Sequence, residues 1–188
     1  MEWLTIIGVI AAAGIVLISI YNRLVALRQN RNNAYADIDV QLKQRFDLIP
    51  NLVETVKGYA NHEKSVFEEV TKFRAQVKEA GTQEERLSAE KALGKAMINV
   101  LAVAENYPDL KADQNFQQLM AELTDIENKL AAARRFFNNA TSEYNTAIQQ
   151  FPANLIAGRF GFKTEEFYEV EESERDVMEK SPDVKFGT

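Results

Sequence analysis

The residue types that carry out acid–base chemistry or bind metals are scarce in this chain of 188 residues, which has one histidine and no cysteine. His62 stands beside Glu63, but zinc sites need three or four nitrogen, sulfur or oxygen ligands. The Glu-x-x-His motif of helical di-iron proteins would need a glutamate where the chain has Tyr59. A lone histidine of this kind is typical of a surface or capping residue. We therefore predict no metal ligand.

Motifs for nucleophilic catalysis and phosphate binding are also missing from the sequence. No Gly-x-Ser-x-Gly elbow occurs, and the absence of cysteine removes a thiol nucleophile. The spacing of Gly158 and Gly161 matches neither the Walker nor the Rossmann pattern. We expect no catalytic residue, no cofactor-binding residue and no cofactor, so the protein is predicted not to be an enzyme. An unrecognised enzyme or solute-binding bundle is the least favoured alternative, and a deep polar pocket with perturbed titratable groups would support it.

Charged side chains gather around Pro50 and again in the last long helical pattern. One interpretation is that they solvate the outer faces of helices. The other pairs a carboxylate of the first group with an arginine of the second in a buried layer that specifies register more than it stabilises. The sequence leaves both open, and Pro50, which lacks a backbone donor, predicts a kink in its helix. The candidates for the layer are Asp47 and Glu54 on one side and Arg134 and Arg135 on the other.

The N-terminal segment has the composition of a membrane-spanning helix. Residues 4–20 carry no charge, and Trp3 and Tyr21 bracket them. Hydrocarbon cannot hydrogen-bond to the backbone, so such a segment is stable there only as a helix. At about 1.5 Å per residue it is roughly 26 Å long, the short end of the range that spans a bilayer. We therefore predict a transmembrane signal anchor over residues 1–22 and the lipid bilayer as a partner.

Two other interpretations of this segment are less favoured. A cleaved secretory signal would need a basic start and a small-residue cleavage site after the apolar core, whereas the three alanines 11–13 lie inside the run. A buried core helix would rarely begin so close to the N-terminus. Arg23, Arg28 and Arg31 follow the segment, and no Lys or Arg precedes it. The positive-inside rule then predicts an outside N-terminus and a bulk domain in the cytoplasm.

The charge balance bears on the partners of the chain. It has 22 lysines and arginines against 28 aspartates and glutamates, a net charge of −6. Residues 163–188 hold nine acidic and four basic residues, so most of the net charge lies there. The basic stripe that binds nucleic acid is not present, and we expect no nucleic acid partner. The acidic tail is either a solvated terminus or a docking surface.

Apolar residues recur every three or four positions through most of the remaining sequence, which is the period of an amphipathic helix. The pattern breaks at Gly81-Thr82 and again before Pro108, because proline forces Tyr107 out of helical geometry. Asp113 is then expected to cap the longest helix by accepting from backbone donors in its first turn. The four apolar sets cover residues 38–60, 66–80, 87–104 and 116–148.

These patterns predict an all-α fold. The segments 23–60 and 113–150 are equally long, and two shorter helices lie between them. An elongated antiparallel four-helix bundle on one N-terminal transmembrane helix would bury all four apolar stripes. We therefore predict a helical bundle domain over residues 23–152.

Residues 153–188 are predicted to form an aromatic-rich acidic C-terminal tail of irregular structure. Within it, the segments 167–170 and 184–186 alternate in a way compatible with short strands. Disordered segments are poor in aromatics, so we expect this tail to dock either on its own bundle or on a neighbouring copy.

Several long motifs occur in order along the chain. The longest, DIDVQLKQRFDLIPNLVETVKGYA, covers residues 37–60. Through these motifs nearly the whole sequence closely resembles the LemA family of bacterial membrane proteins. Phe46 stands where many members have a histidine, which weakens any metal site further. The other motifs are ENYPDLKA over 105–112, ARRFFNN over 133–139, FPANLIA over 151–157 and Pro-x-Val-x-Phe over 182–186.

The resemblance implies an all-helical bundle on one membrane helix and a location in the bacterial inner membrane. Members look like non-enzymatic membrane proteins of poorly defined role. Some occur beside a membrane-embedded zinc metalloprotease, and a relative is linked to magnetosome formation. The resemblance transfers no catalytic, cofactor-binding or metal-binding role to any residue of this chain.

Two functional hypotheses remain from different classes. The favoured one is a self-associating, membrane-anchored scaffold that forms a homo-oligomer. The alternative is a regulatory adaptor or substrate presenter for a membrane zinc metalloprotease, with Asp109, Leu110 and the acidic tail as docking surfaces. The sequence leaves open the physiological process, the identity of a partner and the number of subunits.

Overall fold

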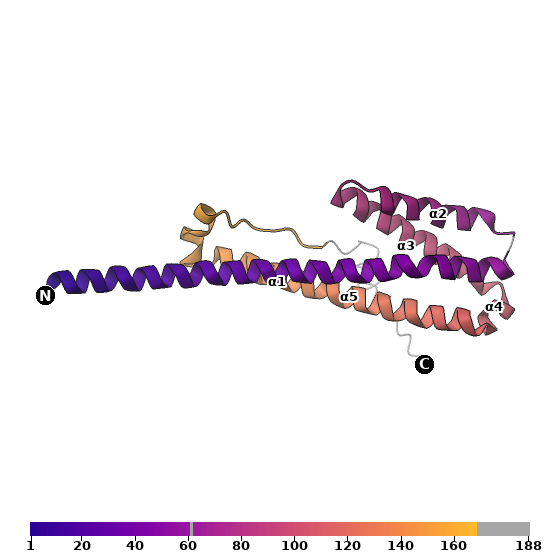
Figure 1. Cartoon of the computed structure of the whole chain (residues 1–188), viewed down its shortest axis with the longest axis horizontal. Coiled ribbons are helices and arrows are strands. Elements are labelled where there is room, and N and C mark those ends of the chain that lie inside the picture. The colour runs from indigo at the N-terminus through magenta and orange to yellow at the C-terminus, as the bar shows by residue number, and fades with distance from the viewer. Residues whose placement is uncertain (61, 169–188) are drawn as a thin grey trace, which may run out of the picture. The chain divides into compact units, whose positions relative to one another are not determined.

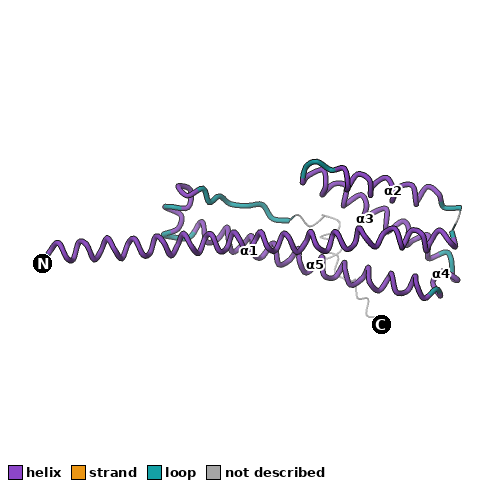
Figure 2. Tube along the Cα trace, in the orientation of Figure 1, coloured by secondary structure: helices purple, strands orange, loops and turns teal. Residues whose placement is uncertain are grey.

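The structure of the chain, a computed structural model, describes residues 1–60 and 62–168 (Figure 1). All regular secondary structure in this part is helical, so the predicted all-α class is confirmed (Figure 2). Two 3-10 turns, η1 and η2, follow the last helix. The elements are α1 (Glu2–Tyr59), α2 (Lys64–Glu79), α3 (Gln83–Glu105), α4 (Pro108–Ala112), α5 (Gln114–Gln149), η1 (Ala153–Leu155) and η2 (Ala157–Phe160).

The first helix joins the apolar N-terminal segment to the amphipathic segment that follows it. α1 is one uninterrupted helix, so backbone hydrogen bonding continues from the apolar segment 4–20 into the amphipathic segment that follows it. The helix also continues through Pro50.

The predicted helix boundaries are confirmed. Thr82 forms a capping box with Glu85: its hydroxyl accepts from the Glu85 N–H, and the Glu85 side chain accepts from the Thr82 N–H. Tyr107 is extended, with φ −120° and ψ 91°, directly before Pro108. Asp113 caps α5, because its carboxylate accepts from the backbone N–H of Phe116 at 2.9 Å.

Helix α4 was not predicted, since five residues are too few to show an apolar period. Pro108 occupies the first turn of this helix, where a missing N–H costs no hydrogen bond. Leu110 is fully buried and holds the short helix against the core.

The chain divides into two compact units, which we name unit 1 and unit 2. Unit 1 comprises Met1–Ala36 and Ala133–Thr188, and unit 2 comprises Asp37–Ala132. Both boundaries fall inside helices, so α1 and α5 each contribute residues to both units.

The core of unit 2 takes apolar residues from all five of its helical segments. α2 and α3 pack side by side after the tight turn that joins them (Figure 1). The buried side chains of the unit 2 core lie three or four residues apart along each helix, as the periodicity predicted. They include Ile49, Leu52 and Val56 of α1, Phe67 and Val70 of α2, Leu93, Met97 and Val100 of α3, Leu110 of α4, and Phe116 and Leu123 of α5.

The core of unit 1 joins the start of the tail to the two long helices. Leu24 of α1 and Tyr144 of α5 are almost completely buried, together with Phe162, which follows the 3-10 turns. Burial raises the pKa of the Tyr144 phenol above its ordinary value of 10.0. The first part of the tail therefore packs on its own unit.

The strands predicted in the tail are not seen where the structure can test them. Phe167 and Tyr168 have no regular secondary structure. The rest of the segment 167–170, and all of 184–186, lie outside the described residues.

Replacing Ile49 by alanine should lower the free energy of unfolding of the full-length protein in detergent by about 2–5 kcal/mol, because a cavity opens in a dense core. Leu123→Ala should cost a similar amount, since both side chains belong to the core of unit 2. Gln118→Ala is the control, because Gln118 is exposed and its amide donates to Glu122 one turn along α5. Chemical denaturation followed by circular dichroism measures all three. An equal loss in the control would refute the assignment of inner faces.

Candidate functional site

The only histidine lies on the surface. His62 is exposed in the turn between α1 and α2. Across residues 1–60 and 62–168, no three His, Asp or Glu side chains are grouped so as to hold a metal ion.

The carboxylates predicted to form an interhelical layer have other partners. Asp47 accepts from the Lys43 ammonium at 2.7 Å, and Glu54 accepts from the Lys57 ammonium at 3.1 Å. Both pairs lie within α1 on exposed side chains, so of the two interpretations left open by the sequence, solvation of the outer face describes these carboxylates and the buried layer does not. In unit 1, the Arg134 guanidinium lies over the ring of Tyr168, 5.2 Å from its centroid.

The buried charged layer of unit 2 is instead built on Arg45. Its guanidinium donates to the Glu90 carboxylate of α3 at 2.9 Å and to the Glu127 carboxylate of α5 at 3.2 Å. The Arg45 and Glu90 side chains are only 7% and 5% exposed, whereas Glu127 is 45% exposed. Three helices are thus joined by one cation, and the Nε of Arg45 is buried without a hydrogen-bond partner among the described residues.

Sequence reasoning missed this layer although a signal was present. Arg45 falls three residues after Leu42 and four before Ile49, and therefore lies on the apolar stripe of α1. Glu90 likewise lies three residues before Leu93 of α3. Opposite charges on facing apolar stripes indicate a buried pair better than charge density along the chain does.

A second polar network in unit 1 holds the start of the tail on α5. The Asn145 side-chain amide donates to the Glu165 carbonyl at 2.8 Å and its oxygen accepts from the Glu165 N–H at 2.8 Å. Asn138, two helical turns away, makes the same pair of bonds with the backbone of Tyr168. The two asparagines therefore form a clamp for an extended segment of backbone.

Arg31 of α1 completes this clamp. Its guanidinium pairs with the Glu165 carboxylate at 3.3 Å, donates to the Thr141 hydroxyl at 3.2 Å and lies 4.7 Å from the Phe137 ring centroid. In the sequence, Asn138 falls within the motif ARRFFNN, which does not reveal its partner. Its partner is a segment with no apolar period, which pattern analysis cannot place.

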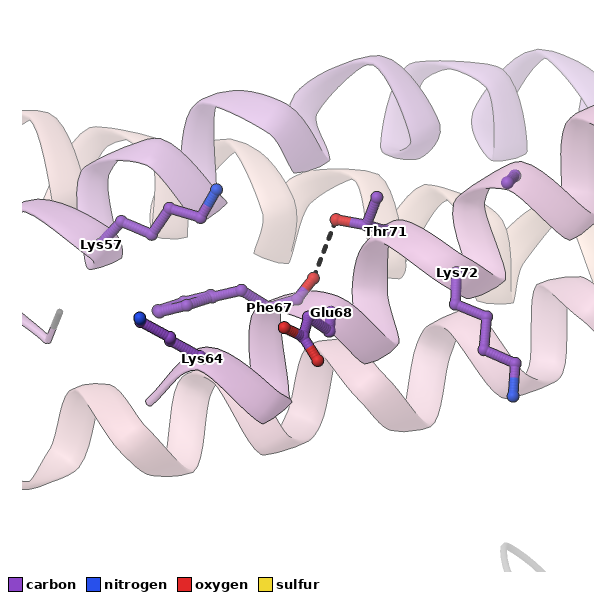
Figure 3. Close-up of a pocket in the computed structure, with 7 residues that line it drawn as sticks. Lys57, Lys64, Phe67, Glu68, Thr71 and Lys72 are labelled. Atoms are coloured by element: carbon purple, nitrogen blue, oxygen red, sulfur yellow. Dashed lines mark hydrogen bonds between the residues drawn. The ribbon is translucent and has the colours of Figure 1, made fainter. Parts of the chain in front are cut away.

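One open pocket of about 630 Å³ lies on unit 2 between the end of α1 and α2 (Figure 3). Lys64 extends alongside the ring of Phe67, and the Lys57 ammonium lies 5.8 Å from that ring's centroid. The Thr71 hydroxyl is already bound, because it donates to the Phe67 carbonyl at 2.9 Å. The lining is completed by Glu68, Lys72 and Ala75.

The chemistry that this pocket offers is binding of an anion. The lining has three lysines and one glutamate, but Lys57 is already paired with Glu54 and the Lys72 ammonium lies 5.6 Å from the Phe73 ring centroid. Such a lining attracts an anionic group that carries an apolar portion.

The N-terminal part of α1 exposes a run of large apolar side chains. An 18-residue window in this helix has a mean hydropathy of 2.5, and none of the window is buried within the chain. By length and composition, this is the one helix in the described part of the chain that could cross a membrane.

Fold and surface define a class of protein: an all-helical chain whose first helix carries an exposed apolar segment. The chain belongs to the LemA family, whose family model matches residues 34–186. The resemblance seen in the motifs is thereby confirmed.

Relatives from different bacteria support the assignment. The chain is 25% identical over 192 residues to magnetosome protein MamQ 2 of Paramagnetospirillum magneticum, covering 88% of this chain and 70% of the relative. It is 25% identical over 174 residues to magnetosome protein MamQ of Magnetospirillum gryphiswaldense, covering 79% and 64%. It is 24% identical over 155 residues to protein LemA of Metamycoplasma hominis, covering 82% and 71%.

Replacing Arg45 by methionine should lower the free energy of unfolding by about 3–5 kcal/mol, because it leaves the Glu90 carboxylate buried without its partner. The double variant Arg45→Met with Glu90→Leu should recover most of that loss, since an apolar pair can replace a buried ion pair. The matched control is Lys43→Met at the exposed pair with Asp47, which should cost less than about 1 kcal/mol. Equal instability of the single and double variants would contradict a buried pair.

The Asp113 cap makes a prediction about pH. The backbone N–H of Phe116, and then the Tyr59 hydroxyl, hold the pKa of Asp113 below its ordinary value of 3.8. The hydrogen bond between the Tyr59 hydroxyl and the Asp113 carboxylate also raises the pKa of Tyr59. The folded state therefore favours the ionised carboxylate, and this stabilisation is present above 3.8 and is lost as pH falls through the lowered pKa.

Asp113→Asn keeps a side-chain acceptor but removes this charge. The difference in unfolding free energy between the wild type and this variant should be largest near neutral pH and should shrink in acid. Denaturant titrations in both conditions measure it. Tyr59→Phe is the control and should retain most of the pH dependence, because the larger cause, the Phe116 N–H, is untouched. A difference that does not change with pH would show that the cap does not depend on ionisation.

Proposed function

We propose that the protein is a non-enzymatic, self-associating scaffold anchored in the bacterial inner membrane by the start of α1. The single observation that carries this proposal is the segment 4–20, which is apolar and exposed and lies in the helix that supplies both hydrophobic cores. In water an exposed apolar surface of this size favours aggregation. In a bilayer the surrounding hydrocarbon covers it, and the helix satisfies its own backbone.

The proposed orientation places the chain that follows the apolar segment in the cytoplasm. Three arginines follow the apolar segment, and the positive-inside rule assigns that side to the cytoplasm. Arg28 lies 5.0 Å from the Phe162 ring centroid, and Arg31 binds Glu165. Arg23 is exposed, so it is the arginine whose replacement tests orientation without disturbing the core of unit 1.

The scaffold role concerns contacts with other copies. A single spanning helix holds every copy parallel on one membrane face, which favours a closed cyclic homo-oligomer. Ile98 of α3 and Phe136 of α5 are large apolar side chains that are 65% and 50% exposed. We propose that these side chains take part in the contacts between copies.

Labelling of one introduced cysteine tests the anchor and its orientation. The chain has no cysteine of its own, and Gly81→Cys lies in the exposed turn between α2 and α3. A Cβ there has Glu85 Oε2 as its nearest neighbour at 3.7 Å, an ordinary contact. The variant should stay in the membrane fraction at high pH, resist an impermeant maleimide in intact cells, and react after lysis.

Arg23→Gln in the same background should raise the fraction labelled before lysis, because it weakens the charge bias. Full labelling of Gly81→Cys in intact cells would place the α2–α3 turn, and with it unit 2, outside the cell. Release of the protein by alkaline extraction would exclude a membrane anchor.

Crosslinking in native membranes tests self-association. A lysine-reactive crosslinker should give a ladder of homomultimers, because copies held parallel in a membrane meet at high local concentration. Migration in mild detergent should show the same assembly. A strictly monomeric protein would refute the scaffold, and a one-to-one product with a membrane zinc metalloprotease would favour the adaptor.

A further inference from the structure

The turns that follow α5 expose large apolar side chains outward. Phe151 is 79% exposed, Leu155 is 71% exposed and Phe160 is 54% exposed. Ala153 and Ala157 of the same turns are buried in the core of unit 1. The turns therefore have a small-residue inner face that fixes them and large apolar side chains that stay more than half exposed.

The turns lie where the apolar segment of α1 ends. The Tyr21 ring meets the Phe160 ring edge to face, with centroids 5.3 Å apart, and the Phe162 ring at 5.6 Å. Ile20, the last residue of the segment 4–20, is partly buried against the same core. The turns thus lie beside α1 at this level (Figure 1).

The length of the apolar segment bears on the level of the bilayer surface. The segment 4–20 is roughly 26 Å long, against about 30 Å of hydrocarbon in a typical bilayer. The shortfall of about 4 Å is less than one helical turn. A bilayer centred on this segment therefore reaches the level of Tyr21, where Phe160 packs.

Charge around the turns fits a lipid surface. From Gln150 to Thr164 the chain has no acidic residue, whereas Arg159 and Lys163 are both exposed. Aromatic side chains flanked by Lys and Arg are typical of segments that lie at the boundary of headgroups and acyl chains. The nearest acidic side chain that follows, Glu165, is paired with Arg31.

We propose that the turns after α5 are a second membrane-contact element, with Phe151, Leu155 and Phe160 inserted at the headgroup–acyl boundary of an anionic bilayer. This inference rests on the proposed membrane anchor of α1 and adds a contact that the anchor alone does not require. Two attachments, one spanning and one interfacial, fix the tilt and rotation of α1 at the surface. Unit 1 then lies against the bilayer.

Tryptophan fluorescence in vesicles tests this contact. Trp3 is the only tryptophan of the chain, so full-length protein in phosphatidylcholine–phosphatidylglycerol vesicles with bromine on shallow acyl carbons reports on the anchor. The variant Trp3→Phe with Leu155→Trp reports on the turns, and the exposed Leu155 leaves room for the larger ring. Trp3→Phe with Ile98→Trp is the matched control, because Ile98 is an equally exposed apolar residue of α3.

The proposal expects Leu155→Trp to lose a fraction of its fluorescence comparable with that lost by Trp3, whereas Ile98→Trp loses none. Quenching of Trp3 without quenching of Leu155→Trp would overturn the interfacial contact and leave the anchor intact. In that case a blue-shifted emission of the Leu155→Trp variant would show that a second copy covers the turns, and a red-shifted emission would show that they face water. An unquenched Trp3 would overturn the anchor, and with it this inference.

Discussion

The backbone hydrogen bonding of α1 couples the exposed apolar segment to the packed part of the chain. An α-helix bonds its interior N–H groups to carbonyls four residues earlier. Residues 4–20 of α1 can therefore lie in hydrocarbon with their backbone groups satisfied. Packing begins at Ile20, the last residue of that segment, and continues at Leu24. The same helix then supplies Ile49 to the core of unit 2. The environment of residues 4–20 therefore bears on a helix that contributes side chains to both hydrophobic cores.

Each unit combines an apolar core with one buried or half-buried arginine that selects partners. In unit 2, Arg45 joins three helices through Glu90 and Glu127. In unit 1, Arg31 lies between Thr141 and Glu165, and asparagines on α5 bind the backbone of the tail. Apolar stripes slide past one another at little cost, whereas a buried cation has few registers in which it is paired. We infer that these groups specify the packing more than they stabilise it.

Much of the helical architecture could be predicted from local chemistry. Thr82 before Glu85, Tyr107 before Pro108, and Asp113 before an apolar run each act within one turn of the chain, so the sequence shows them directly. The partner of Arg45 could not be read this way, because it depends on which helices face one another. The Asn138 clamp depends on an extended segment with no period. The all-α class and the family were predicted correctly, whereas the residues of the buried charged layer, Arg45 and Glu90, were not among the candidates for it.

The continuity of α1 from the apolar segment into the packed part of the helix is open to one direct measurement. Hydrogen–deuterium exchange of the full-length protein in lipid nanodiscs reports the opening of each stretch of backbone. If α1 is continuous, amides from residue 4 to beyond Leu24 should be protected without a gap, since lipid and then the core of unit 1 cover the helix. Rapid exchange confined to the residues around Tyr21 would reveal a hinge there and would contradict a rigid link between the membrane segment and the packed units.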